Sequence, residues 1–235
     1  MKQGTTIIIG VILVMALFVT LESANALTDK ERWEKDFGDG YRSFPLDPPV
    51  ILEHGGPDQG GYYYIDSDDN ALNAPVFNWS DISSIGIPVS LGDDSTAGPF
   101  PMGFDFNFYG NDYNQFYICS NGWISFTSTS TSYSNLPIPN SSEPNDLLAI
   151  FWDDLNPANG GQIYYYSDAT SHQLVVSYDG IPHYPDVGAL YFQVLINAND
   201  SSMIYHYGLM DDAGHGNNGA TVGIENESDH CSTNN

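Results

Sequence analysis

Short apolar runs alternate with turn residues along most of the chain, and this pattern predicts an all-β protein. The clearest run is Phe104-Asp105-Phe106-Asn107-Phe108, in which three aromatic residues alternate with two polar ones. A period of two residues puts the aromatic side chains on one face of a strand and the polar side chains on the other. We therefore expect Phe104, Phe106 and Phe108 to face the core.

Similar runs recur from residue 60 to 225, including one at 76–79, and no long window keeps a helical period. We expect an antiparallel β-sandwich, jelly-roll-like, with about 10–12 short strands and little helix. Asn121-Gly122 separates two runs, at 115–119 and 123–127, and predicts a two-residue type I′ turn between antiparallel neighbours. The expected core residues are Phe104, Phe106, Phe108, Phe126, Ile150, Trp152, Phe192, Val194 and Ile224.

The first residues predict a secretion signal rather than a part of the fold. Lys2 precedes an apolar run at 7–19, and Ala24-Asn25-Ala26 supplies the small residues that signal peptidase requires. The run is short for a membrane span, which needs about 20 residues. We expect a signal peptide at 1–26, a leader at 27–59, the sandwich at 60–228 and a tail at 229–235. The mature chain is then a secreted or cell-surface protein without a membrane span.

Charge is distributed very unevenly. The net charge is −25, and none of the five basic residues lies after Arg42. A surface rich in Asp and without Lys or Arg repels phosphate groups, so nucleic acid and anionic membranes are not expected partners. The negative charge must be relieved by salt screening, by bound cations or by a basic partner.

Calcium is the one cofactor that the acidic residues suggest. Asp66-x-Asp68-x-Asn70 offers oxygen ligands at alternate positions, as the beginning of a calcium loop does. The turn glycine and the bidentate glutamate of an EF-hand are missing, so we expect a looser Ca2+ site completed by Asp93, Asp94 or backbone carbonyls. The alternatives are an Asp-rich turn whose side chains cap their own backbone, or an adaptation to high salt.

Cys119 and Cys231 are the two cysteines of the chain. An even number of cysteines in a secreted protein favours a disulfide, and we predict one between these two residues. The alternatives are two separate thiols, or a Cys231 that pairs with a cysteine outside this sequence. The bridge requires the last strand to end on the same side of the sandwich as the Asn121-Gly122 turn.

Tyrosines and paired acidic residues are the candidate ligand contacts. Tyr63 and Tyr165 each lie in a run of three tyrosines, which must place at least one ring away from the core. Such rings can stack on sugars, although packing at a sheet surface also explains them. Asp153-Asp154 follows a predicted strand and is the best placed acidic pair. These four residues are the expected ligand-facing positions.

Catalytic motifs are missing from the sequence. There is no His-Glu-x-x-His helix, no Gly-x-Ser-x-Gly turn and no glycine loop for phosphate. The cluster at 229–231, Asp-His-Cys, lies in a polar tail that would not hold catalytic geometry. Consecutive acidic residues on a strand point to opposite faces, which argues against a glycosidase pair. We expect a protein that is not an enzyme.

Several segments between residues 104 and 207 share the order and spacing of a known family. They lie at 108–110, 116–126, 149–155, 161–165, 191–195 and 204–207. Together they resemble the nidogen-like extracellular domain, in the version found in secreted microbial multidomain proteins. The resemblance implies an extracellular β module used in adhesion and matrix contacts, with no catalytic residues.

The sequence thus predicts a non-catalytic extracellular interaction or adhesion module. A carbohydrate-binding module is the first alternative, and an accessory domain of a secreted hydrolase is the second. The expected partner is an extracellular protein or a glycan.

Overall fold

The computed structural model describes residues 5–11, 54–68, 74–213 and 219–227. Within these residues the chain forms strands and connecting loops, with no α-helix. The strands are β1 (Thr5–Val11), β2 (His54–Gly55), β3 (Tyr62–Asp66), β4 (Ile87–Val89), β5 (Thr96–Phe108), β6 (Asn111–Cys119), β7 (Trp123–Ser125), β8 (Leu147–Trp152), β9 (Gln162–Asp168), β10 (Gln173–His183), β11 (Val187–Asn197), β12 (Ser202–Asp211) and β13 (Thr221–Glu225).

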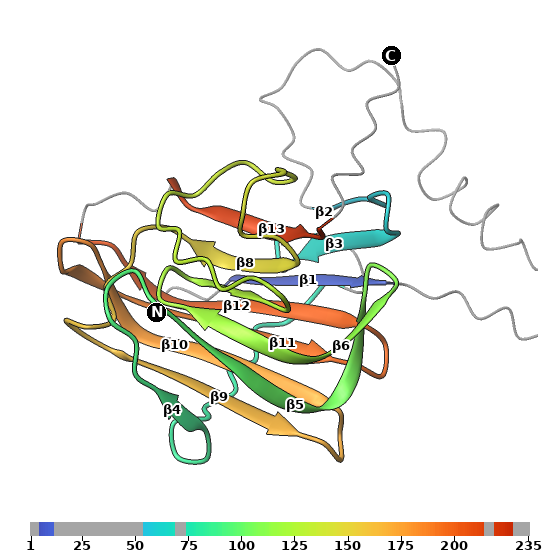
Figure 1. Ribbon diagram of the computed structural model, residues 1–235, viewed down its shortest axis with the longest axis horizontal. Coiled ribbons are helices and arrows are strands. Elements are labelled where there is room, and N and C mark those ends of the chain that lie inside the picture. Colours follow the sequence, from blue (N-terminus) through green and yellow to red (C-terminus); the bar gives the residue numbers. More distant parts are fainter. Residues whose placement is uncertain (1–4, 12–53, 69–73, 214–218, 228–235) are drawn as a thin grey trace, which may run out of the picture. The chain divides into compact units, whose positions relative to one another are not determined.

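Two antiparallel sheets make up the fold (Figure 1). The larger sheet has the strand order β2-β3-β1-β12-β11-β10-β9-β4, and the smaller has the order β13-β8-β7-β6-β5. Aromatic pairs join the two layers: Phe151 of β8 lies 5.6 Å from Phe192 of β11, and Phe100 of β5 lies 4.8 Å from Tyr165 of β9, between ring centroids. The predicted all-β antiparallel sandwich is confirmed.

The core follows the alternation that the sequence shows. Phe106 and Phe108 are fully buried, while Asp105 and Asn107 between them are exposed. Phe104 is half-buried and packs against the same core, so the predicted inward face of β5 is confirmed. The other expected core residues that are buried are Phe126, Ile150, Trp152, Phe192 and Val194, and Ile224 packs against the core from a half-buried position.

The segment at 76–79 was expected to be a strand and is not one. It lies within the stretch 74–82, which joins no sheet. The backbone of Ser80 instead exchanges two hydrogen bonds with the side-chain amide of Gln193 on β11, at 2.9 and 3.1 Å. Phe77 contacts His206 of β12 edge-on, with 5.6 Å between ring centroids. Phe77 therefore packs on the larger sheet without extending it, whereas Val76 beside it is 83% exposed.

The turn after β6 also differs from the expected type I′ geometry. β6 and β7 are antiparallel neighbours as predicted, with Tyr117 opposite Ser125 and Ile118 opposite Ile124. A type I′ turn needs positive φ at both central residues. Of Asn121 and Gly122, only Gly122 has a positive φ, of 78°. The Asn121 side chain is fully buried.

Strands β1 and β2 extend the larger sheet beyond the predicted sandwich boundary at residue 60. β1 pairs with β3 on one side and β12 on the other, with Ile7 opposite both Asp66 and Tyr205. An apolar run of β-branched residues suits a position inside a sheet as well as it suits a signal peptide. Removal of residues 1–26 on export, with loss of β1, stays a prediction. None of the described residues forms a helix long and apolar enough to cross a membrane.

Candidate functional site

Three carboxylates from different loops meet at one end of the sandwich. Asp93 and Asp94 lie in the loop between β4 and β5, and Asp154 follows β8. One carboxylate oxygen from each residue lies within 4.8 Å of the others. We call these three residues the acidic loop cluster.

Asn121 fixes the relative position of the two acidic loops. Its side-chain amide donates a hydrogen bond of 2.9 Å to Oδ1 of Asp94, and its Oδ1 accepts one of 2.9 Å from the backbone N–H of Leu155. The Asn121 carbonyl also accepts a bond of 3.3 Å from the N–H of Asp153. A buried amide that bonds with both of its ends holds two segments at a defined distance. The β6–β7 turn therefore positions Asp94 beside Asp154.

The hairpin between β10 and β11 adds a third loop. The N–H of Tyr184 donates to the carbonyl of Asp154 at 2.9 Å. Asp186, in the same hairpin, accepts hydrogen bonds from the side-chain amides of Asn156 and Asn159 at 3.0 and 2.9 Å. Nδ1 of the buried His183 lies 3.8 Å from Oδ2 of Asp153. Asp186 is thereby held close to the acidic loop cluster.

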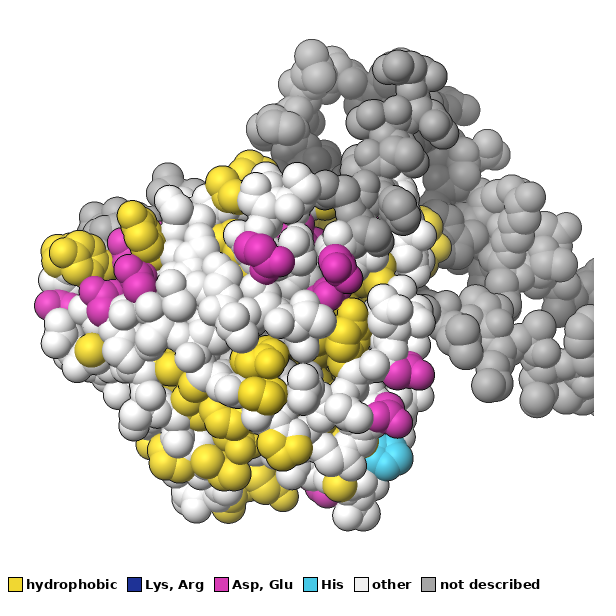
Figure 2. All heavy atoms as spheres, viewed as in Figure 1, with side chains coloured by type: hydrophobic (Ala, Val, Ile, Leu, Met, Phe, Trp, Pro, Cys, Tyr) yellow, Lys and Arg dark blue, Asp and Glu magenta, His cyan; other side chains and the backbone are white. Residues whose placement is uncertain are grey.

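The electrostatic environment of these loops is uniformly negative. The pKa of Asp93 is raised above its ordinary value by partial desolvation, and further by the negative charges of Asp94 and Asp186. The sequence has no Lys or Arg after Arg42 that could offset them. Figure 2 shows Asp and Glu side chains on the visible face and no Lys or Arg side chain among the residues described there. The site thus favours any group that brings positive charge to it.

When a carboxylate has a raised pKa in the folded state, its ionisation destabilises the folded state relative to the unfolded state. The carboxylate's contribution to stability is present below the unfolded-state pKa of about 4 and is lost as the pH rises through the folded-state pKa. At pH 7 and low salt without divalent cations, we expect Asp93→Asn to raise the melting temperature. The gain should be small, because Asp93 is exposed and screened by solvent. It should disappear near pH 3, where Asp93 is protonated in both states.

Asp81 is the matched control for this measurement. Its pKa is lowered by hydrogen bonds from the hydroxyl and the N–H of Ser83, at 2.6 and 3.0 Å. A lowered pKa stabilises the fold above the unfolded-state pKa, so Asp81→Asn should lower the melting temperature at pH 7. Shifts of the same sign in both variants would contradict the assigned environment of Asp93.

The spacing of the acidic loop cluster fits a cation with oxygen ligands. Two oxygens that share one Ca2+ at about 2.4 Å lie no more than about 4.8 Å apart. Calcium takes six to eight oxygen ligands, so backbone carbonyls or a partner would have to add to these three side chains. The geometry is thus suitable for part of a calcium site.

The five residues expected to share one metal site are not brought together. Asp93 and Asp94 follow β4, which forms one edge of the larger sheet, whereas Asp66 ends β3 near the opposite edge. Oδ1 of Asp66 accepts a hydrogen bond of 2.9 Å from the N–H of Asp68, as in an Asp-rich turn that caps its own backbone. Asn70 lies outside the described residues. The structure instead places Asp154, which was expected only as a ligand contact, beside Asp93 and Asp94.

One of the two tyrosines that were expected to face a ligand is buried instead. Tyr165 is buried in the core against Phe100 and Phe116, so it does not face a ligand. Strand alternation exposes its neighbour Tyr166 instead. Tyr63, the other expected ligand-facing ring, is exposed on β3.

Cys119 is a buried thiol at the end of β6. Burial raises its pKa to about 11, so it stays protonated at neutral pH. Cys231 lies outside the described residues, and its pairing with Cys119 stays a prediction.

Asn121, Asp186 and His183 were not expected at this site. The sequence signal for Asn121 was its place before Gly122, which was interpreted as turn geometry alone. Asp186 was one exposed Asp among many, and only the pairing of β10 with β11 brings it near Asp93.

The fold and its loops define a class of protein: an antiparallel β-sandwich with an acidic loop surface at one end. Residues 74–235 match the family described as NIDO related, and the chain belongs to this nidogen-related family. A segment of 59 residues is 41% identical to dendrite extension defective protein 1 of Caenorhabditis elegans. That segment covers 25% of this chain and 5% of the relative, so the chain matches only a small part of it. No solved structure matches the chain significantly.

Proposed function

We propose that this protein is a non-catalytic extracellular interaction module that contacts a partner protein through its acidic loop cluster, with Ca2+ as the counter-charge. The observation that carries the proposal is the convergence of Asp93, Asp94 and Asp154 from two loops, in a protein whose described residues include no Lys or Arg to neutralise them. Negative charges held this close repel one another unless a cation or a basic partner is bound.

Positioning of the loops supports an interaction surface. Loops carried by a rigid β framework are a common place for binding residues. Here the buried Asn121 connects the loops to that framework, because its side chain bonds to Asp94 and to the backbone of Leu155. The Asp94 carboxylate and the backbone next to Asp154 are therefore held in place before any ligand arrives, which lowers the entropy cost of binding.

Family membership supports the extracellular setting. The nidogen-related match and the secretion signal expected at 1–26 agree on an exported protein. One relative is named for a defect in dendrite extension, which is in keeping with contacts at cell surfaces. The absence of catalysis is part of the proposal, and the raised pKa of the buried Cys119 thiol agrees with it, because a protonated thiol is a poor nucleophile.

The proposal predicts that calcium stabilises the fold. A ligand that binds only the native state adds RT ln(1 + [L]/Kd), which is about 2.7 kcal/mol at a hundredfold excess over Kd. We expect a higher melting temperature in millimolar CaCl2 than in NaCl of the same ionic strength. Equal shifts of the melting temperature in the two salts would mean that ionic screening alone stabilises the protein, and would reject a calcium site.

Two double variants show which residues are responsible for the calcium-dependent increase in melting temperature. Asp93→Asn with Asp94→Asn should abolish the calcium increment while the protein stays folded. Asp66→Asn with Asp68→Asn, at the turn after β3, should leave the increment unchanged. If the second pair of substitutions removes it instead, the site is at β3. For the interaction itself, binding of the purified chain to cells that display extracellular matrix should require calcium and should fall in the first double variant.

A further inference from the structure

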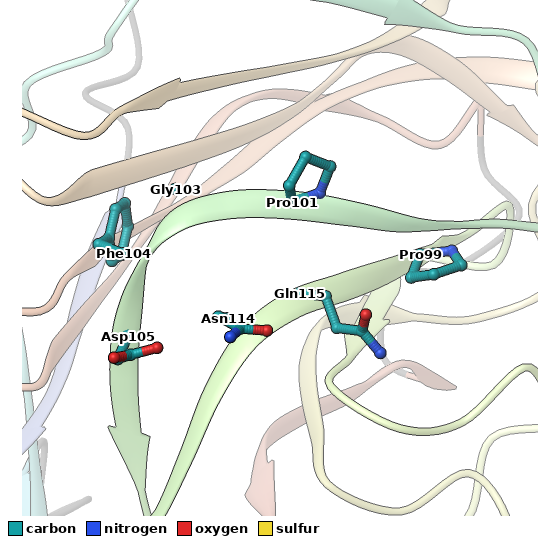
Figure 3. A pocket seen from close by; sticks show the side chains of 7 residues that line it. All are labelled: Pro99, Pro101, Gly103, Phe104, Asp105, Asn114 and Gln115. Atoms are coloured by element: carbon teal, nitrogen blue, oxygen red, sulfur yellow. The ribbon is translucent and has the colours of Figure 1, made fainter.

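An open hollow of about 510 Å³ lies between β5 and β6 of the smaller sheet. Figure 3 shows β5 arching away from β6, with Asn114 and Gln115 on β6 beside the opening and Pro101 and Phe104 along the arch of β5. Three are apolar rings and three are polar groups, and none belongs to the acidic loop cluster: Pro99, Pro101, Phe104, Asp105, Asn114 and Gln115. The size falls within the range of roughly 300–1,000 Å³ that is usual for small-molecule sites.

A bulge in β5 creates the hollow. Pro101 is opposite Gln115 and Phe106 is opposite Tyr113, so residues 102–105 of β5 face the single residue Asn114 of β6. The longer stretch must arch away from its neighbour. Proline within β5 is tolerated because β5 is an edge strand, where a missing backbone donor breaks no ladder bond.

Contacts with the larger sheet hold the bulge in place. Met102 is buried in the core, and its carbonyl accepts a hydrogen bond from the hydroxyl of Ser167 on β9. Gly103 has a φ of 81°, and a Cβ there would lie 3.3 Å from the Cβ of Ala169. The Phe104 ring lies 5.8 Å from the imidazole of His172. The hollow is thus preformed and supported by the β9–β10 hairpin.

We propose that this hollow binds a neutral saccharide. Sugar rings present apolar C–H faces and hydroxyl edges, so they need apolar rings beside groups that donate and accept hydrogen bonds. Phe104, Pro99 and Pro101 supply the apolar surface. Asp105 accepts from hydroxyls, and the amides of Asn114 and Gln115 both donate and accept.

The negative charge of the site restricts the class of sugar that it can bind. Asp105 is exposed at the hollow, and the sequence after Arg42 contains no Lys or Arg to pair with an acidic sugar. Sulfated, phosphorylated or carboxylated sugars would be repelled. Hydrophobic side chains also gather over the part of the visible face where β5 and β9 run (Figure 2). The site therefore suits a neutral oligosaccharide.

The test is a titration of the ¹⁵N-labelled full chain, in EDTA, with lactose, maltotriose and cellotriose, and with sialyllactose as the anionic comparison. At least one neutral sugar should shift the side-chain amide signals of Asn114 and Gln115, with a Kd on the order of 1 mM. Asn114→Ala and Asp105→Ala should each weaken that binding about tenfold. Asn107→Ala, on the same exposed side of β5 but outside the hollow, should leave it unchanged.

Three outcomes would overturn the proposal: no shift with any neutral sugar, shifts confined to residues outside the hollow, or equal binding of sialyllactose. The work in EDTA separates this site from the calcium-dependent function proposed above. Binding that persists in the Asp93→Asn/Asp94→Asn variant supports the saccharide site whether or not the acidic loop cluster holds calcium.

Discussion

Phe106→Ala is expected to lower the free energy of unfolding by about 3–5 kcal/mol. Phe106 is fully buried on β5, and its ring centroid lies 6.4 Å from that of Phe108 and 5.6 Å from that of Phe126. Removing the ring loses its transfer free energy and leaves a cavity that the surrounding aromatic residues fill only in part. Urea unfolding should show a lower midpoint with an unchanged m-value.

Asn107→Ala is the control for this experiment. Asn107 is exposed on the opposite face of the same strand, and its side-chain amide donates a hydrogen bond of 2.7 Å to the carboxylate of Asp112 on β6. Its loss should change stability by no more than about 0.5 kcal/mol. Comparable losses for Phe106→Ala and Asn107→Ala would contradict the inward register of β5.

Gly122→Ala is expected to cost about 2–5 kcal/mol. Gly122 has a φ of 78°, a conformation that costs an L-residue roughly 1–2 kcal/mol. A Cβ at this position would also lie 1.9 Å from the carbonyl oxygen of Phe151 on β8. Since backbone cannot rotate away as a side chain can, the turn must separate from β8 and weaken the bonds that the N–H groups of Ile150 and Phe151 donate to the Gly122 carbonyl.

Gly110→Ala separates the cost of a positive φ from the cost of the close contact with Phe151. Gly110, in the β5–β6 turn, has a φ of 83° but nothing within 4 Å of the added Cβ. Gly110→Ala should therefore lower the free energy of unfolding only by the cost of placing an L-residue at a positive φ, roughly 1–2 kcal/mol. Calorimetric melting of the two variants compares them directly. The close contact with β8 is wrong if Gly122→Ala costs no more than Gly110→Ala. Because Asn121 precedes Gly122, the calcium response should also fall in Gly122→Ala and persist in Gly110→Ala.

Local patterns were sufficient to predict the strands and much of the core. Alternation in β5 identified Phe106 and Phe108 as inward residues, because the two-residue period of a strand is a property of the backbone itself. The same period could not distinguish Tyr165 from Tyr166, since a run of three tyrosines has no polar partner to mark the outer face. Residues 76–79 have the composition of a strand, yet the Gln193 side chain takes the backbone bonds of Ser80.

The sequence by itself determined an all-β chain, a one-sided charge distribution and the resemblance to the nidogen-like domain. Only the tertiary structure decided which acidic residues meet. Asp93 and Asp154 are about 60 residues apart in the chain and come together because β4 and β8 lie in different sheets whose ends face one another across Asn121. The hollow at Asn114 likewise depends on a register shift between β5 and β6. Strand order and register are long-range properties, and a local hydrophobic pattern does not specify them.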